Sequence, residues 1–137
     1  MKYWHDDMLT ELAHVVLTKY ADIDERIDKI SRGSVAIDFR FCDKAKKKGS
    51  YTVNGDCYKV PDRLKDDTPF DFIITFYEPN TIGMTTDQLE LLMYHELLHV
   101  DYKLDANGDP VPKFRQHDIE DFRSIVSEHG IDWAVAE

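Results

Sequence analysis

The sequence has no long hydrophobic run, few cysteines and no excess of positive charge. No apolar stretch approaches the roughly 20 residues that span a bilayer, so we expect no membrane-spanning helix. The first residues lack the apolar segment of a signal peptide and include Asp6 and Asp7. The two cysteines, Cys42 and Cys57, form no C-x-x-C pair, which excludes a zinc ribbon and makes a disulfide framework unexpected. These absences predict a protein of the reducing cytoplasm.

The charge balance and the composition narrow the class of protein further. The 137 residues include 17 lysines and arginines against 27 acidic residues, and the net charge is −10. Nucleic-acid binding and docking on an anionic membrane both need basic surfaces, so neither is expected. A hydrophobic content of 42% is enough for a core, and no linker or internal repeat divides the chain. We therefore expect a single domain over residues 1–137.

Hydrophobic periodicity predicts helices near both ends of the chain. Apolar residues recur at helical spacing from about residue 6 to residue 20, and Ile23, Ile27 and Ile30 share one face of a second, shorter helix. A last helix is expected to begin near Asp118, after a loop rich in glycine and proline.

Strands are predicted between these helices. Apolar and polar residues alternate over 35–41, and the apolar run 72–77 is typical of a well-buried strand. The Asn54-Gly55 pair predicts a hairpin between 51–53 and 57–60. The order of helices, strands and helices favours an α+β fold. A basic run, which we expect to be a solvated loop, precedes the hairpin and contains Lys44, Lys46, Lys47 and Lys48.

The segment His95-Glu96-Leu97-Leu98-His99 carries the chemistry. It reads H-E-x-x-H, the signature of zinc hydrolases, and lies in a helix predicted from about Thr86 to Lys103. Side chains four residues apart share one face of a helix, so both imidazoles can reach a single ion. Glu96 can then activate a metal-bound water without ligating the metal. The alternative is an exposed polar stripe, but the surrounding leucines favour a buried helix, in which these groups need partners.

A catalytic zinc takes three protein ligands and keeps one position for water, so the motif requires a third ligand. His117 is favoured because it lies at the predicted start of the last helix, where a fold-back brings it near the motif. Asp118 and Glu120 are the alternative ligands, and these residues or Asp121 can instead orient a ligating imidazole. Without a metal, His117 is interpreted as a helix-capping residue. The other histidines are expected on helix surfaces: His5, His14 and His129.

The motif, followed by His117-Asp118-x-x-Asp121-Phe122, resembles small zinc peptidases that pair H-E-x-x-H with a downstream histidine. SprT-like proteases and minigluzincin-type domains share that layout. The sequence is most similar to the phage metallopeptidase family, over about Val35 to Gly130. This likeness implies that the cytoplasm in which the protein acts is that of a bacterial host or a phage-infected cell. The likeness includes the strand Asp71-Phe72-Ile73-Ile74 before the motif.

The resemblance implies a zincin-like fold, in which a sheet of three to four strands, mixed or antiparallel, packs against the motif helix. It implies a zinc-dependent peptidase with His95, His99 and His117 on the metal, Glu96 as general base, and a peptide or protein substrate. Zincin-type enzymes pair the substrate with a sheet edge. The strand 35–41 and the strand 72–77 are both candidates for that edge. SprT-like enzymes carry a zinc ribbon and a basic tail, which this chain lacks, so DNA-linked protein substrates are not expected.

Three alternatives stay open at this point. A non-catalytic acidic phage protein with a structural metal can act as a decoy for a nucleic-acid enzyme, because dense carboxylates imitate phosphates. Such a binder does not need Glu96. A metal-dependent nuclease is disfavoured, since it needs a basic groove. Within the peptidase interpretation, Tyr94 or Tyr102 either stabilises the oxyanion or simply packs.

Overall fold

Helices and strands are mixed along the chain, and this confirms the predicted α+β class. The computed structural model describes residues 1–116, so the helix predicted near Asp118 lies outside the described residues. The helices are α1 (Asp7–Tyr20), α2 (Glu25–Arg32), α3 (Glu78–Thr81) and α4 (Thr86–Leu97), with a 3-10 turn η1 (Asp62–Leu64). The strands are β1 (Tyr3–His5), β2 (Ile37–Cys42), β3 (Lys46–Lys48), β4 (Tyr51–Val53), β5 (Gly55–Lys59), β6 (Phe72–Tyr77), β7 (Val100–Leu104) and β8 (Pro110–Phe114).

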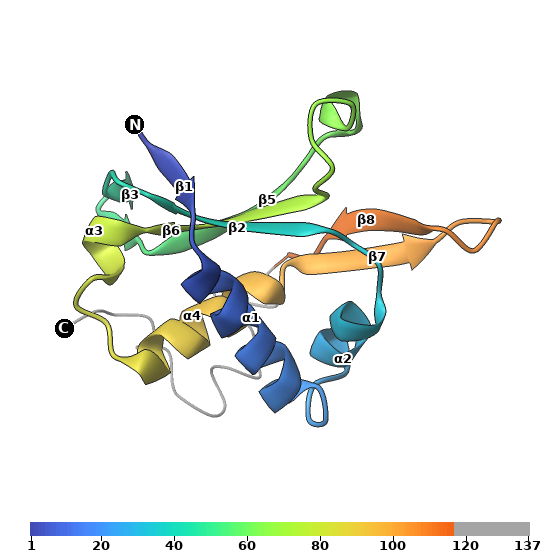
Figure 1. Cartoon of the computed structure of the whole chain (residues 1–137), viewed down its shortest axis with the longest axis horizontal. Helices are drawn as coiled ribbons and strands as arrows, with labels where there is room; N and C mark the ends of the chain where they lie inside the picture. Colours follow the sequence, from blue (N-terminus) through green and yellow to red (C-terminus); the bar gives the residue numbers. More distant parts are fainter. Residues whose placement is uncertain (117–137) are drawn as a thin grey trace.

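The main sheet has four strands in the order β1-β2-β6-β5 (Figure 1). β2 and β6 are parallel, while β1 and β5 are antiparallel to their neighbours. The strands predicted at 35–41 and 72–77 are therefore confirmed, but both lie in the middle of the sheet. The expectation that one of them is a substrate-binding edge is wrong, because β1 and β5 occupy the two edges.

Helices α1 and α4 cover one face of this sheet, and α2 lies beside them (Figure 1). The apolar side chains of the helices and the sheet meet there, and burial of each such side chain contributes about 1.5–3 kcal/mol. The side chains at this interface with no exposed surface include Leu9, Val16, Phe72, Ile74, Phe76, Met93 and Leu97. None of the described helices has the length and hydrophobicity needed to cross a membrane.

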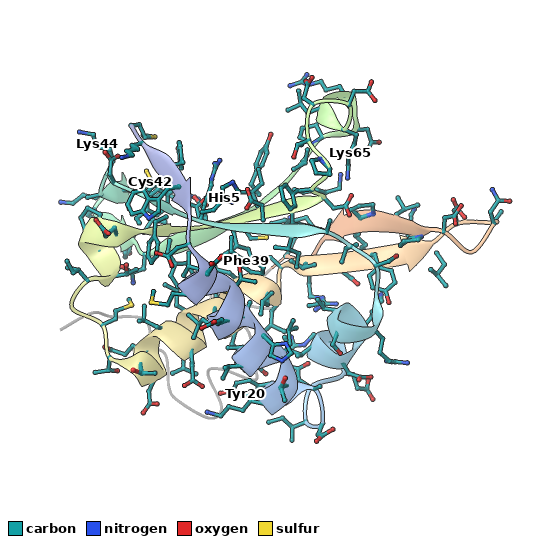
Figure 2. All side chains as sticks on the ribbon, in the orientation of Figure 1. His5, Tyr20, Phe39, Cys42, Lys44 and Lys65 are labelled. Atoms are coloured by element: carbon teal, nitrogen blue, oxygen red, sulfur yellow. The ribbon has the colours of Figure 1, made fainter. Side chains whose placement is uncertain are left out.

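The opposite face of the sheet carries polar side chains. Figure 2 shows Phe39 on the helix side of the sheet and His5 on the other side. His5 belongs to strand β1 rather than to the first helix, and its Nδ1 lies 2.7 Å from Asp38 Oδ1. The prediction of a helical His5 is wrong because the first helix begins only after Asp6, whose carboxylate caps it. His14 is exposed on α1, as expected.

The predicted hairpin around Asn54-Gly55 is wrong. The hairpin forms earlier in the chain, between β3 and β4. Gly49 lies in its turn and has the positive φ, 63°, that this turn requires. The basic segment 46–48 is thus a strand and not a loop. The backbone carbonyl of Asn54 accepts a hydrogen bond from Tyr77 N–H, which directs the following strand β5 into the main sheet beside β6.

The motif helix starts as predicted and ends earlier. Thr85 and Gln88 form the predicted capping box at the start of α4. The helix stops at Leu97 instead of residue 103, because residues 100–104 pair with residues 110–114 in the β7–β8 hairpin. The carboxylate of Asp105 stabilises the turn of this hairpin by accepting two backbone N–H groups. Strand pairing in this hairpin therefore overrides the helical pattern of the sequence.

A buried carboxylate ties α2 to the motif helix. Asp24 is 7% exposed, caps α2, accepts hydrogen bonds from the Arg26 side chain and accepts another from the Tyr94 hydroxyl. Burial by itself raises the pKa of Asp24, but the hydrogen bonds and charge of Arg26 and the hydrogen bond from Tyr94 outweigh it. The pKa of Asp24 in the folded protein is therefore below its ordinary value of 3.8.

We expect Asp24→Asn to lower the free energy of unfolding by about 2 kcal/mol at pH 7, because it removes a buried charge from its partners. Because the folded-state pKa is depressed, this contribution is present above pH 3.8 and is lost as the pH falls through the lower folded-state pKa. Urea unfolding of both proteins between pH 7 and pH 3 measures the difference. Asp22→Asn, at an exposed neighbour, is the control. A constant difference down to the lowest pH would contradict the assignment.

Candidate functional site

The two histidines of the motif remain on one side although the helix ends between them. Leu98 keeps helical angles, with φ −67° and ψ −17°, and His99 N–H donates to the carbonyl of Glu96 at 3.1 Å. This tightened last turn preserves the four-residue spacing that a continuous helix would give. The rings of His95 and His99 lie 5.2 Å apart between centroids, at 80° to each other.

His95, Glu96 and His99 form a cluster of metal-ligating type. One donor atom from each residue lies within 4.8 Å of the other two, and Glu96 and His99 are only 3% and 6% exposed. His99 Nε2 and Glu96 Oε1 are 4.0 Å apart. A buried carboxylate and a buried imidazole beside the half-buried His95 are costly without compensation, which a divalent cation can supply. The donor set therefore suits a metal ion, with nitrogen ligands of the kind that zinc accepts.

The end of strand β8 orients the His99 ring. The carbonyl of Arg115 lies 2.8 Å from His99 Nδ1, and Arg115 N–H donates to the carbonyl of His99 at 2.8 Å. Because a carbonyl only accepts, Nδ1 carries the proton and Nε2 carries the lone pair. Phe114 stacks on the same ring with centroids 4.7 Å apart and planes at 17°. His99 is therefore held in the tautomer and the orientation that a metal ligand needs.

A series of contacts between charged side chains connects Arg115 to helix α2. The Arg115 guanidinium donates to the carbonyl of Leu98 and lies 3.3 Å from Asp101, whose carboxylate also accepts from Lys29 at 2.7 Å. Burial acts to raise the pKa of Asp101, but the hydrogen bonds from Lys29 and from the Tyr102 backbone, with the charge of Arg115, bring it below its ordinary value. Sequence reasoning missed Arg115 and Asp101, because only the unforeseen hairpin brings them to the motif.

The cluster opens into a pocket of about 500 Å³ between the motif, the edge strand β5 and the β3–β4 hairpin. Burial, followed by the nearby carboxylates of Glu96 and Asp56, raises the pKa of the Cys57 thiol well above its ordinary value, so this thiol is uncharged at neutral pH. Cys42 and Cys57 are both unbridged, as expected. The pocket is lined by Lys46, Lys47, Lys48, Val53, Gly55, Asp56, Cys57, His95, Glu96, His99, Phe114 and Gln116.

The remaining candidates fall into two groups. One group lies outside the described residues: His117, the alternative ligands Asp118 and Glu120, Asp121, and His129, which was expected on a helix surface. Tyr94 and Tyr102 are described, and their hydroxyls donate to Asp24 and to the carbonyl of Lys29. Both hydroxyls are therefore engaged in contacts of the kind that the packing alternative expects.

Comparison with known proteins agrees with this site. Searches of curated proteins and of solved structures found no match. The model of the family described as "Putative phage metallopeptidase" matches residues 1–136, nearly the whole chain and more than the span over which we noted the resemblance. A metallopeptidase acts on peptide bonds with a metal ion, which fits a largely buried His-Glu-His group that lines a pocket. The chain belongs to this phage metallopeptidase family.

Proposed function

We propose that this protein is a zinc-dependent peptidase with a zincin-like fold formed by the whole chain as a single domain. His95, His99 and His117 would hold the zinc ion, and Glu96 would be the general base. The observation that carries this proposal is the convergence of donor atoms of His95, Glu96 and His99 within 4.8 Å of one another in the lining of a pocket. Membership in the metallopeptidase family supports it independently.

The donor chemistry supports zinc as the metal. Imidazole nitrogens suit zinc well, and a third histidine would complete the three-ligand set of catalytic sites, which leaves one position open. When bound, zinc lowers the pKa of a coordinated water toward about 7 and polarises the scissile carbonyl. The hydrogen bond from His99 Nδ1–H to the Arg115 carbonyl supports ligation through Nε2.

His117 is proposed as the third ligand from its place in the sequence. Arg115 holds His99, and Gln116 lines the pocket that contains the motif. His117 is the next residue in the chain, and consecutive Cα atoms are only about 3.8 Å apart. The proposal therefore requires only that the residue directly after Gln116 also faces the pocket that contains the motif.

Glu96 is the proton carrier in this proposal. Its side chain is 3% exposed, lines the pocket, and lies one position after the first ligand. Glu96 accepts a proton from the attacking water and later returns it to the leaving amine, so that the carboxylate is regenerated. The burial of this side chain restricts its motion, which favours general-base catalysis.

Strand β5 is the proposed substrate-binding edge. One side of β5 pairs with β6, and Gly55, Asp56 and Cys57 line the pocket beside the motif. An extended peptide can add to such an edge through main-chain hydrogen bonds. This arrangement would present a peptide bond to Glu96 without requiring a particular side chain.

The test measures metal content and hydrolysis together. Purified protein is expected to hold one zinc per chain by mass spectrometry and to cleave denatured casein. Treatment with 1,10-phenanthroline should abolish cleavage, and added zinc should restore it, because the general base has no activated water without the ion. Hydrolysis that survives complete removal of metal would contradict the proposal, and so would protein that takes up no zinc from a zinc-containing buffer.

A further inference from the structure

Three consecutive lysines, Lys46, Lys47 and Lys48, form strand β3 and line the same pocket as the motif. The whole chain has a net charge of −10, whereas this part of the pocket lining is positively charged. The pocket lining contains only two carboxylates in the described part of the chain, those of Asp56 and Glu96. A concentration of ammonium groups beside a peptidase site is a feature that the proposed chemistry does not use.

The base of the β3–β4 hairpin is fixed to the main sheet. Lys46 Nζ lies 2.7 Å from Asp56 Oδ2, and the same oxygen accepts a hydrogen bond from the Tyr77 hydroxyl at 2.7 Å. The Asn80 side chain donates to the carbonyls of Lys46 and Val53, at 3.1 and 2.8 Å. Asn80 therefore joins the two strands at their open end and holds the hairpin in place at the pocket.

Lys47 and Lys48 are not neutralised in this arrangement. Both side chains are exposed, and within residues 1–116 neither has a carboxylate at ion-pair distance, whereas the charge of Lys46 is balanced by Asp56. Two lysines on a fixed hairpin therefore present positive charge at the pocket wall. A solvated loop, which the sequence alone favoured, would have no such anchor at Lys46 and Val53.

We infer that the β3–β4 hairpin binds a carboxylate of the peptide substrate through Lys47 and Lys48, so that the enzyme prefers acidic peptides. The inference rests on the proposed peptidase function and names the substrate class of that same site. The carboxylate comes either from an aspartate or glutamate side chain or from the C-terminus of a peptide. The overall negative charge repels acidic peptides at long range, so the preference depends on these two lysines at contact distance.

Three quenched fluorescent peptides of one neutral parent sequence separate the possibilities. The first has an amidated C-terminus, the second is amidated with a glutamate moved through successive positions, and the third has a free C-terminus. We expect the second or the third to be cleaved with kcat/KM about fivefold above the first. This preference should disappear in Lys47→Gln/Lys48→Gln and at high salt, as exposed charge interactions do. The control Lys44→Gln/Lys103→Gln changes the net charge equally at exposed positions outside the pocket lining and should keep the preference.

Binding supplies a second measurement that does not depend on turnover. Fluorescence anisotropy with zinc-loaded Glu96→Gln protein should show the same fivefold preference, again lost when Lys47 and Lys48 are replaced. Equal binding of acidic and neutral peptides would overturn the inference, whether or not the parent hydrolyses them. Lysine-dependent binding of acidic peptides with no hydrolysis by the parent would instead support the inference and overturn the proposed function.

Discussion

Replacing Glu96 with glutamine is expected to leave zinc bound and to reduce peptide hydrolysis by about a thousandfold. General-base catalysis contributes on the order of 10² to 10⁴ in rate, and an amide cannot accept the proton of the attacking water. Glutamine has nearly the volume of glutamate, so the buried position, which is 3% exposed, keeps its packing. Zinc content by mass spectrometry and kcat/KM with a fluorescent peptide measure the two effects separately.

Glu90 provides the matched control for this variant. It lies on the same helix α4, is half-buried, and its carboxylate is 3.2 Å from Lys19 Nζ. Glu90→Gln should change kcat/KM by less than about twofold, since Glu90 does not line the pocket that contains the motif. If Glu96→Gln kept full activity, the general-base role would be wrong. If neither the parent nor the variant hydrolysed peptides, the acidic metal-binding alternative would gain support.

The grouping of His95, Glu96 and His99 could be predicted from the sequence because its geometry is local. His95 and His99 are four residues apart, and a single helical turn brings them together whatever the rest of the chain does. The structure keeps this relation even though α4 ends at Leu97. The support for His99 could not be predicted, because Arg115 reaches the ring only through the β7–β8 pairing. A hairpin that follows the motif leaves no periodic trace in the motif itself.

The strands show the same division between local and long-range information. Alternation and a continuous apolar run identified the two central strands, 37–42 and 72–77, since burial on the sheet dictates those patterns. The Asn54-Gly55 pair is a good local turn signal, yet the chain turns at Gly49 and continues through Asn54 into the main sheet. The pairing of strands depends on the packing of the whole core. β5 pairs with β6 because the backbone groups on that side of the buried strand β6 need hydrogen-bond partners.

The pocket wall was the part of the site least accessible to sequence reasoning. A run of lysines has no hydrophobic periodicity, so the basic segment was predicted to be a solvated loop. Only the contacts of Asp56 and Asn80 fix the hairpin where Lys47 and Lys48 line the pocket. If Lys47 and Lys48 bind the substrate as we infer, the distribution of charge over the fold, and not the net charge of −10, determines which substrates the site favours.

Replacing either motif histidine with alanine is expected to abolish stoichiometric zinc binding and peptide hydrolysis together. His95 and His99 supply two of three proposed ligands, and loss of one should weaken zinc binding by at least a thousandfold. Zinc that binds only the folded state adds about 2.7 kcal/mol of stability at a hundredfold excess over Kd. Added zinc should therefore raise the melting temperature of the parent but not that of His95→Ala or His99→Ala. His14→Ala, at an exposed histidine of α1, is the control and should behave as the parent.

The corresponding His117→Ala variant decides the third ligand. If His117 binds the ion, this variant should lose zinc and the zinc-dependent rise in melting temperature to the same extent as the motif variants. Its melting temperature without zinc should match that of the metal-free parent, because a ligand stabilises only the bound state. Full zinc occupancy in His117→Ala would exclude His117. Asp118→Ala and Glu120→Ala would then identify the carboxylate that takes its place, since zinc also accepts carboxylate oxygens.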